Sequence, residues 1–218
     1  MCVICVSHKG IRQPNEEEIT NMWKTNPHGA GYMFIKNGKV EIHKGFMELR
    51  DFIRSVKSEE FTDDDVVVYH FRISTQAGIT PEMTHPFPLS EDLKDMNLLD
   101  CTCSVGIAHN GVIRLTSTND QKYSDTALFI TEYLPMLIRD TEDITDKRVK
   151  KTIRALINSK MVLINGDGDV TIIGDFWADG KSGLMYSNKS FLPTEQFSRT
   201  WNLGELYGYK YKTAKNYR

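Results

Sequence analysis

The fold of this chain is constrained most by the way its apolar segments are paired along the sequence. Runs of apolar, β-branched residues flank Asn37-Gly38, and two more flank the segment from Asn165 to Gly168. An Asn-Gly pair between such runs is the strongest short-range signal of a β-hairpin. Because the strands come as hairpins and do not alternate with helices, the pattern predicts antiparallel sheets with helices packed on them. Further strands are expected in the first six residues and at 66–74, 105–115 and 183–187.

Helices are predicted where apolar residues recur at helical spacing. The first of these segments opens with Asn15 followed by Glu16, Glu17 and Glu18, which is typical of a helix start. The predicted helices cover residues 15–25, 47–57, 124–138 and 147–158. The segment 75–104 contains several prolines and is predicted to be mostly loop.

Length and charge narrow the classes of protein to which the chain can belong. Its 218 residues suit one domain, and 40% hydrophobic with 26% charged residues is ordinary for a globular protein. A formal net charge of −2 predicts no general affinity for nucleic acid or for an anionic membrane. No apolar run reaches the ~18–20 residues of a membrane span. We therefore expect a cytoplasmic protein, and the sequence leaves open whether it forms a homo-oligomer.

The first six residues place a cysteine directly after the initiator methionine. If an aminopeptidase removes Met1, Cys2 carries both a thiol and a free α-amine, whose reference pKa of roughly 7.7–8.0 suits a base. Two other interpretations remain open. A retained Met1 over a buried, inert Cys2 is one, and a zinc site made with Cys5, Cys101 and Cys103 is the other. The β-branched residues around Cys2 favour a strand, which does not suit chelation, so we expect no metal.

Three other features have ordinary structural explanations when each is taken alone. Arg72 ends an apolar strand and needs an anion, which an internal carboxylate could supply. Asn110-Gly111, between two apolar runs, is typical of a hairpin turn. Asp125 precedes an apolar helical stripe and suits the first turn of a helix.

Together, in this order, these features resemble the class II glutamine amidotransferase domain of the N-terminal-nucleophile hydrolases. The matching stretches are Met1-Cys2, His70-Phe71-Arg72-Ile73-Ser74-Thr75, Thr84-His85-Pro86, His109-Asn110-Gly111 and Ser124-Asp125-Thr126. The resemblance implies an α+β fold, a four-layer αββα sandwich of two stacked antiparallel sheets flanked by helices. It implies one such domain over residues 1–195, with 196–218 left as a basic, aromatic tail.

The resemblance also implies a role for each residue. Cys2 would attack the side-chain amide of glutamine and form a γ-glutamyl thioester, while Asn110 and Gly111 hold the oxyanion. Arg72 would bind the substrate α-carboxylate, and Asp125 the α-ammonium. Thr75 and His85 would belong to the loop that closes over the substrate. No cofactor is implied. The chain departs from many family members in having Ile73 after Arg72 and Gln76-Ala77-Gly78 after Thr75.

Because the chain carries no synthase domain after the resemblance ends, an ammonia acceptor would sit on a separate synthetase protein. Two alternatives stay open at this point. One is an amide hydrolase of the same superfamily that acts on a γ-glutamyl or other linear amide, with water as the only acceptor. The other is a catalytically inactive binding module with the same fold and a retained Met1.

Overall fold

A computed structural model describes residues 1–74, 78–115 and 123–193 of the chain. The strands are β1 (Val3–Ser7), β2 (Ala30–Lys36), β3 (Lys39–Phe46), β4 (Val67–Phe71), β5 (Phe87–Pro88), β6 (Asp100–Cys103), β7 (Val105–Asn110), β8 (Lys160–Asn165), β9 (Val170–Ile173), β10 (Trp177–Ala178) and β11 (Met185–Tyr186). The α-helices are α1 (Glu16–Thr25), α2 (Leu49–Ser58), α3 (Asp125–Glu132), α4 (Leu134–Leu137) and α5 (Lys147–Ile157), and short 3₁₀ turns are η1 (Pro81–Met83), η2 (Leu93–Asn97) and η3 (Thr141–Thr145). Residues 196–218, predicted to be a tail, lie outside the described part.

The first sheet has seven strands in the order β10-β11-β1-β4-β2-β3-β6, and neighbouring strands pair antiparallel. β1 lies inside this sheet, between β4 and β11. The predicted hairpin at Asn37-Gly38 is confirmed, because both residues have positive φ, 52° and 72°, as a tight two-residue turn requires. β6 was not predicted: it falls in the segment 75–104 and pairs with β3.

The second sheet has four strands in the order β5-β7-β8-β9. The predicted hairpin over 160–174 is confirmed by the pairing of β8 with β9. The prediction of a hairpin turn at Asn110-Gly111 is wrong. β7 ends at Asn110, pairs with β5 and β8, and is followed by no strand before Leu115. Asn110-Gly111 is therefore the free end of a strand.

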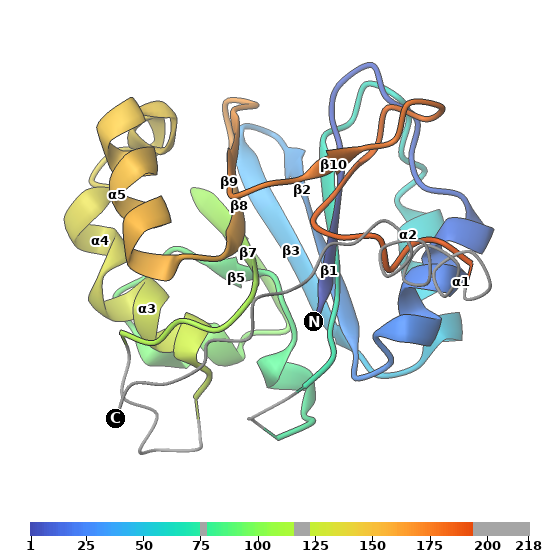
Figure 1. The fold of residues 1–218 in the computed structure, drawn as a ribbon, viewed down its shortest axis with the longest axis horizontal. Helices are drawn as coiled ribbons and strands as arrows, with labels where there is room; N and C mark the ends of the chain where they lie inside the picture. Colours follow the sequence, from blue (N-terminus) through green and yellow to red (C-terminus); the bar gives the residue numbers. More distant parts are fainter. Residues whose placement is uncertain (75–77, 116–122, 194–218) are drawn as a thin grey trace, which may run out of the picture.

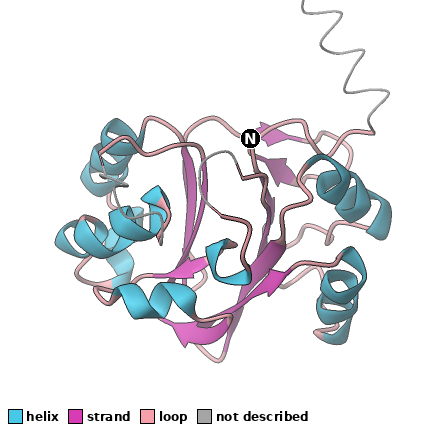
Figure 2. Cartoon of the chain, turned by 90° about the horizontal axis from the view of Figure 1, so that it is seen from below, coloured by secondary structure: helices cyan, strands magenta, loops and turns pink. Residues whose placement is uncertain are grey.

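The layers follow from three hydrophobic clusters. One lies between the two sheets and includes Ile4, Val68 and Val162. A second joins the outer face of the first sheet to α1 and α2, and a third joins the outer face of the second sheet to α3, α4 and α5. Figure 1 shows the helices on both outer sides of the paired sheets, and Figure 2 shows the same arrangement from below. The predicted α+β class, with two antiparallel sheets and helices outside them, is confirmed.

Local sequence explains where the helices begin and end. Asn15 and Glu18 form a capping box at the start of α1, with each side chain bonded to the other's backbone N–H. The helix predicted over 124–138 is broken at Tyr133, because Pro135 has no N–H and its ring crowds the preceding turn. Across the three described ranges, no helix is both long enough and apolar enough to cross a membrane.

Candidate functional site

Cys2 immediately precedes β1, a strand in the interior of the first sheet. Its thiol contacts the backbone of Ile73, with the Ile73 N–H 3.4 Å from Sγ, and this contact places Cys2 beside the segment that follows β4. Asn188 Nδ2 donates to the Cys2 carbonyl at 2.6 Å, which fixes the backbone from the other side. Met1 precedes Cys2 and is 79% exposed. The cysteine is thus anchored on both sides while the residue before it lies open to solvent.

The surroundings of the Cys2 thiol act on its pKa in opposite directions. Burial raises the pKa because it disfavours the thiolate. The N–H of Ile73, the positive charge of the N-terminus and the guanidinium of Arg72 each act to lower it. Burial is the largest of these effects, so the pKa of the thiol lies above its ordinary value, and the N–H of Ile73 and the two positive charges offset part of the rise.

Arg72 is the most unusual side chain of the site. Only 6% of it is exposed, and its buried Nη1 has no hydrogen-bond partner within the described part of the chain. Burial lowers the pKa of the guanidinium. No ion pair involving Arg72 occurs among residues 1–74, 78–115 and 123–193, so the internal carboxylate pair considered from the sequence is not found there. Its backbone is fixed by Gly29 and His28, at 2.8 and 2.9 Å.

Asn110 and Gly111 form the end of β7. The side chain of Asn110 is 5% exposed, and its Nδ2 donates to Ser187 Oγ at 2.8 Å. Gly111 has φ +156°, and a Cβ there would overlap Ser159. Only glycine therefore fits at this position without a shift of its neighbours. The backbone N–H of Gly111 and the Asn110 amide lie on consecutive residues, as a pair of oxyanion donors would.

Asp125 is the first residue of α3, directly after the capping Ser124. One carboxylate oxygen accepts from Ile113 N at 2.6 Å, and the other accepts from Thr126 N at 2.7 Å. Since Ile113 is two residues beyond Gly111, the carboxylate ties the segment after β7 to the start of α3. The prediction of Asp125 as a helix-start residue is confirmed, and the same contacts hold it close to the Asn110-Gly111 segment.

His85 is 6% exposed, and neither of its ring nitrogens has a hydrogen-bond partner among the residues that the structure describes. Its ring packs on His70, with centroids 4.3 Å apart, and lies 6.5 Å from that of His109. His70 Nε2 in turn contacts the carbonyl of His109 at 3.0 Å, which links the two sheets. His85 is thus buried next to these histidines. Thr75, predicted for the same loop, lies outside the described residues.

Several polar residues of this region were missed by sequence reasoning. Ser187 and Asn188 contact Asn110 and Cys2, although they are separated from them by 77 and 186 residues. Ser159 and Thr126 bond the two ring nitrogens of His109, at 2.7 and 2.8 Å. Ser187, Asn188 and Ser159 stand in stretches with no motif, so only the fold could reveal them.

Hydrogen bonds and the chain itself connect five of the predicted site residues, Cys2, Arg72, Asn110, Gly111 and Asp125, and among the described residues they do not include His85. From Cys2 one set leads to Ile73 and Arg72, and the other leads through Asn188 and Ser187 to Asn110. Asp125 joins at Ile113. The arrangement could therefore let three groups act on one small substrate. These are the Cys2 thiol as a nucleophile, the Arg72 guanidinium as a partner for a carboxylate, and the Asn110 amide with the Gly111 N–H as hydrogen-bond donors. Nowhere in the described ranges do three or more His, Cys, Asp or Glu side chains gather as a metal site would require.

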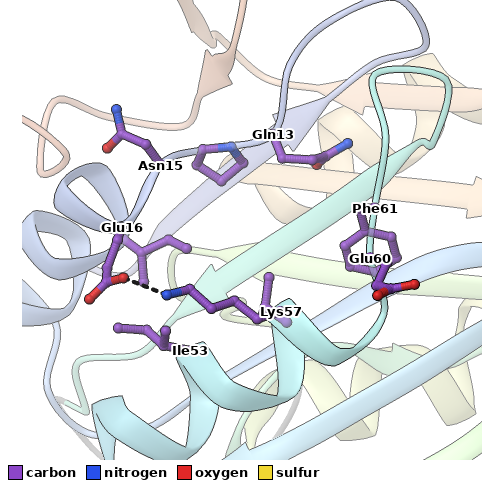
Figure 3. Close-up of a pocket in the computed structure, with 10 residues that line it drawn as sticks. Gln13, Asn15, Glu16, Ile53, Lys57, Glu60 and Phe61 are labelled. Atoms are coloured by element: carbon purple, nitrogen blue, oxygen red, sulfur yellow. Dashed lines mark hydrogen bonds and ion pairs between the residues drawn. The ribbon is translucent and has the colours of Figure 1, made fainter.

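A separate pocket of about 330 Å³ lies between the start of α1 and the end of α2 (Figure 3). Its lining includes the apolar Ile19, Ile53 and Phe61, and Glu16 and Lys57, which also line it, form an ion pair at 2.7 Å. None of the residues that line it belongs to the set around Cys2. The pocket offers apolar surface and a satisfied ion pair, and no nucleophile.

Comparison with known proteins adds no family to this description. A scan against protein-family models gave no match, and a search of curated proteins found no similar sequence.

Proposed function

We propose that the protein is a glutamine amidohydrolase of the amidotransferase type, in which Cys2 releases ammonia from the glutamine side-chain amide. The observation that carries the proposal is Nη1 of Arg72, which is buried and has no hydrogen-bond partner among the described residues, on a guanidinium that interacts electrostatically with the Cys2 thiol. A buried cation without a counter-ion is costly, and a substrate carboxylate would compensate it. Glutamine supplies such a carboxylate, together with an amide for the thiol to attack.

The chemistry requires that Met1 be removed, so that the α-amine belongs to Cys2. The amine then takes the thiol proton, and the sulfur attacks the side-chain carbonyl carbon of glutamine. The C–N bond of the tetrahedral intermediate breaks, and the protonated amine gives its proton to the leaving ammonia. Water cleaves the resulting γ-glutamyl thioester, which yields glutamate and the free thiol.

The remaining residues stabilise and hold the reacting groups in this proposal. The Asn110 amide and the Gly111 N–H would receive the oxyanion, a role in which one donor is worth about 2.7–4 kcal/mol. Asp125 would hold the substrate ammonium, opposite Arg72. Thr75 and His85 are assigned to substrate positioning.

Two further parts of the proposal concern the fold and the setting. The stacked antiparallel sheets with helices on both outer faces support assignment to the N-terminal-nucleophile hydrolase fold, as one domain over 1–195. A working thiol suits the reducing cytoplasm. We assign the ammonia to an acceptor on a separate synthetase protein.

The intact mass of the purified protein tests the proposal, before and after incubation with an electrophilic glutamine analogue. Loss of Met1 and one adduct mapped to Cys2 are expected, with Cys5→Ala reacting as the wild type does. A retained Met1 and no adduct would refute the enzyme and favour a binding module. Faster turnover of γ-glutamyl amides with large leaving groups than of glutamine would instead favour the hydrolase without an acceptor.

A further inference from the structure

Ser187 connects the strand of the nucleophile to the end of β7. Only 1% of the residue is exposed, and its hydroxyl oxygen accepts from Ile4 N and from Asn110 Nδ2, both at 2.8 Å. Ile4 lies two residues beyond Cys2 on the same backbone. One buried hydroxyl therefore contacts both halves of the proposed catalytic site.

The hydroxyl also limits how the Asn110 amide can be oriented. In the orientation described, Asn110 Nδ2 donates to Ser187, and Asn110 Oδ1 is buried without a partner. If the amide is turned over, the Ser187 O–H donates to Oδ1, and Nδ2 takes the place of the unpartnered atom. Either orientation leaves at least one N–H of Asn110 unused by Ser187 and free for an oxyanion.

We propose that Ser187 is the positioning residue that aims the Asn110 amide at the oxyanion and holds it in register with Cys2. The inference rests on the proposed function and names a residue that acts through Asn110. A backbone hydrogen bond already joins Ser187 to β1, because Ser187 N donates to Ile4 O at 2.9 Å, and the side chain of Lys160 on β8 donates to Ser187 O. The hydroxyl is thus not needed to attach the Ser187 segment to β1. The inference gives a reason for its other contact, the hydrogen bond with Asn110.

A double-mutant cycle on ammonia release from glutamine tests the inference. Removing an oxyanion donor costs about 10²–10³ in kcat, and misdirecting one costs less. Ser187→Ala is therefore expected to lower kcat roughly 10- to 100-fold, with KM within about twofold. Ser187→Thr keeps the hydroxyl and should recover most of kcat. In an Asn110→Ala background, Ser187→Ala should cost less than about twofold, because residues acting as a unit are not additive.

Ser7→Ala is the matched control. Ser7 is a fully buried serine on β1 whose hydroxyl bonds Ile11 O and Arg12 O, away from Asn110. Its loss should lower the melting temperature and leave kcat unchanged. The inference alone is overturned if wild type is active and Ser187→Ala behaves like Ser7→Ala, or if the Ser187 and Asn110 effects multiply. Wild type with neither ammonia release nor a Cys2 adduct overturns the proposed function, and this inference with it.

Discussion

At the scale of single residues, the site contains residues whose burial or backbone conformation does not favour folding. Arg72 keeps a charged nitrogen buried without an acceptor, and Gly111 adopts a backbone conformation that only glycine tolerates. Such features cost stability and persist where they serve binding or chemistry. Replacing Arg72 should therefore raise stability and weaken function, whereas replacing Gly111 should lower stability.

Arg72→Met should stabilise the free protein while it weakens glutamine binding. Removing a buried, unpartnered charge is worth about 1 kcal/mol or more, which corresponds to roughly 2–4 °C in melting temperature for a chain of this size. Loss of charged hydrogen bonds worth about 1.5–3 kcal/mol should raise KM by about 10- to 150-fold. Arg50→Met, at a site where the side chain is 84% exposed, should change neither quantity. A lower melting temperature for Arg72→Met would show that Arg72 is a structural ion.

Gly111→Ala should destabilise the protein by about 2–4 kcal/mol, because it combines backbone strain with overlap at Ser159. Urea unfolding measures the loss. Adding Ser159→Gly removes the overlap and should restore part of the stability, while the strain at φ +156° remains. Full recovery in the double variant would mean that the backbone conformation itself costs nothing.

At the scale of elements, prediction from the sequence succeeded where the signal is local. The signals for the turn at Asn37-Gly38 and for the helix start at Asn15 lie within a few residues of the structure they determine, and both features were predicted. Asn110-Gly111 carries the same dipeptide signal but ends a strand, because β7 pairs with β8, some fifty residues later in the chain. β6 was missed for a similar reason, since its strand character depends on its partner β3.

The residues of the candidate site also fall into two groups, those with a local signal in the sequence and those without one. Cys2, Arg72, Asn110 and Asp125 could be selected because each stands in a recognisable short context. Contacts made by Ser187 and Asn188 span 77 and 186 residues, and no local pattern marks either residue. Sequence thus indicates the groups that would do chemistry, while the residues that orient them depend on the packing of distant strands.

The turns of two hairpins, β2–β3 at Asn37-Gly38 and β8–β9 at 165–168, provide a test at the scale of elements. They are called the hairpin tips below. Gly38 has φ +72° and open space around it, so Gly38→Ala should cost about 1–2 kcal/mol from backbone strain alone. A Cβ on Gly166 would overlap the Gly38 carbonyl, so Gly166→Ala should push the two tips apart. Hydrogen exchange should rise at both turns in Gly166→Ala and only at its own turn in Gly38→Ala. Equal local effects would show that the tips do not support each other.

At the scale of the whole molecule, three buried histidines near the ends of β4 and β7 should make stability depend on pH. Burial lowers the pKa of His70 to about 3 and of His109 to about 4, and the pKa of His85 falls well below its ordinary range. The guanidinium of Arg72 adds to the lowering at His70 and His85. In the unfolded chain the same groups titrate near 6.5, so the unfolded state binds more protons between about pH 6.5 and 4.

The free energy of unfolding should therefore fall as the pH is lowered through this window, and it should be unaffected by these groups above it. Urea unfolding from pH 7 to pH 4 measures the slope. Replacing His85 by Phe removes one titrating ring and should reduce the proton uptake on unfolding by about one. His43→Phe is the control, because His43 lies on β3 in contact with Asp100, outside this cluster. If the free energy of unfolding of His85→Phe depends on pH as steeply as that of the wild type, protonation of His85 does not contribute to the loss of stability.

The position of β1 also has a consequence for synthesis. The first strand to be made pairs with β4 early, but its other neighbour is β11, and Ile4 reaches Ser187 only across 183 residues. At about 5–20 residues per second, that separation corresponds to roughly 10–40 s of translation. Until then the Asn110 amide has no hydroxyl to orient it. On the proposed function, a nascent chain would carry its cysteine long before it could use it, so ammonia would be released only after the segment that contains Ser187 has been made.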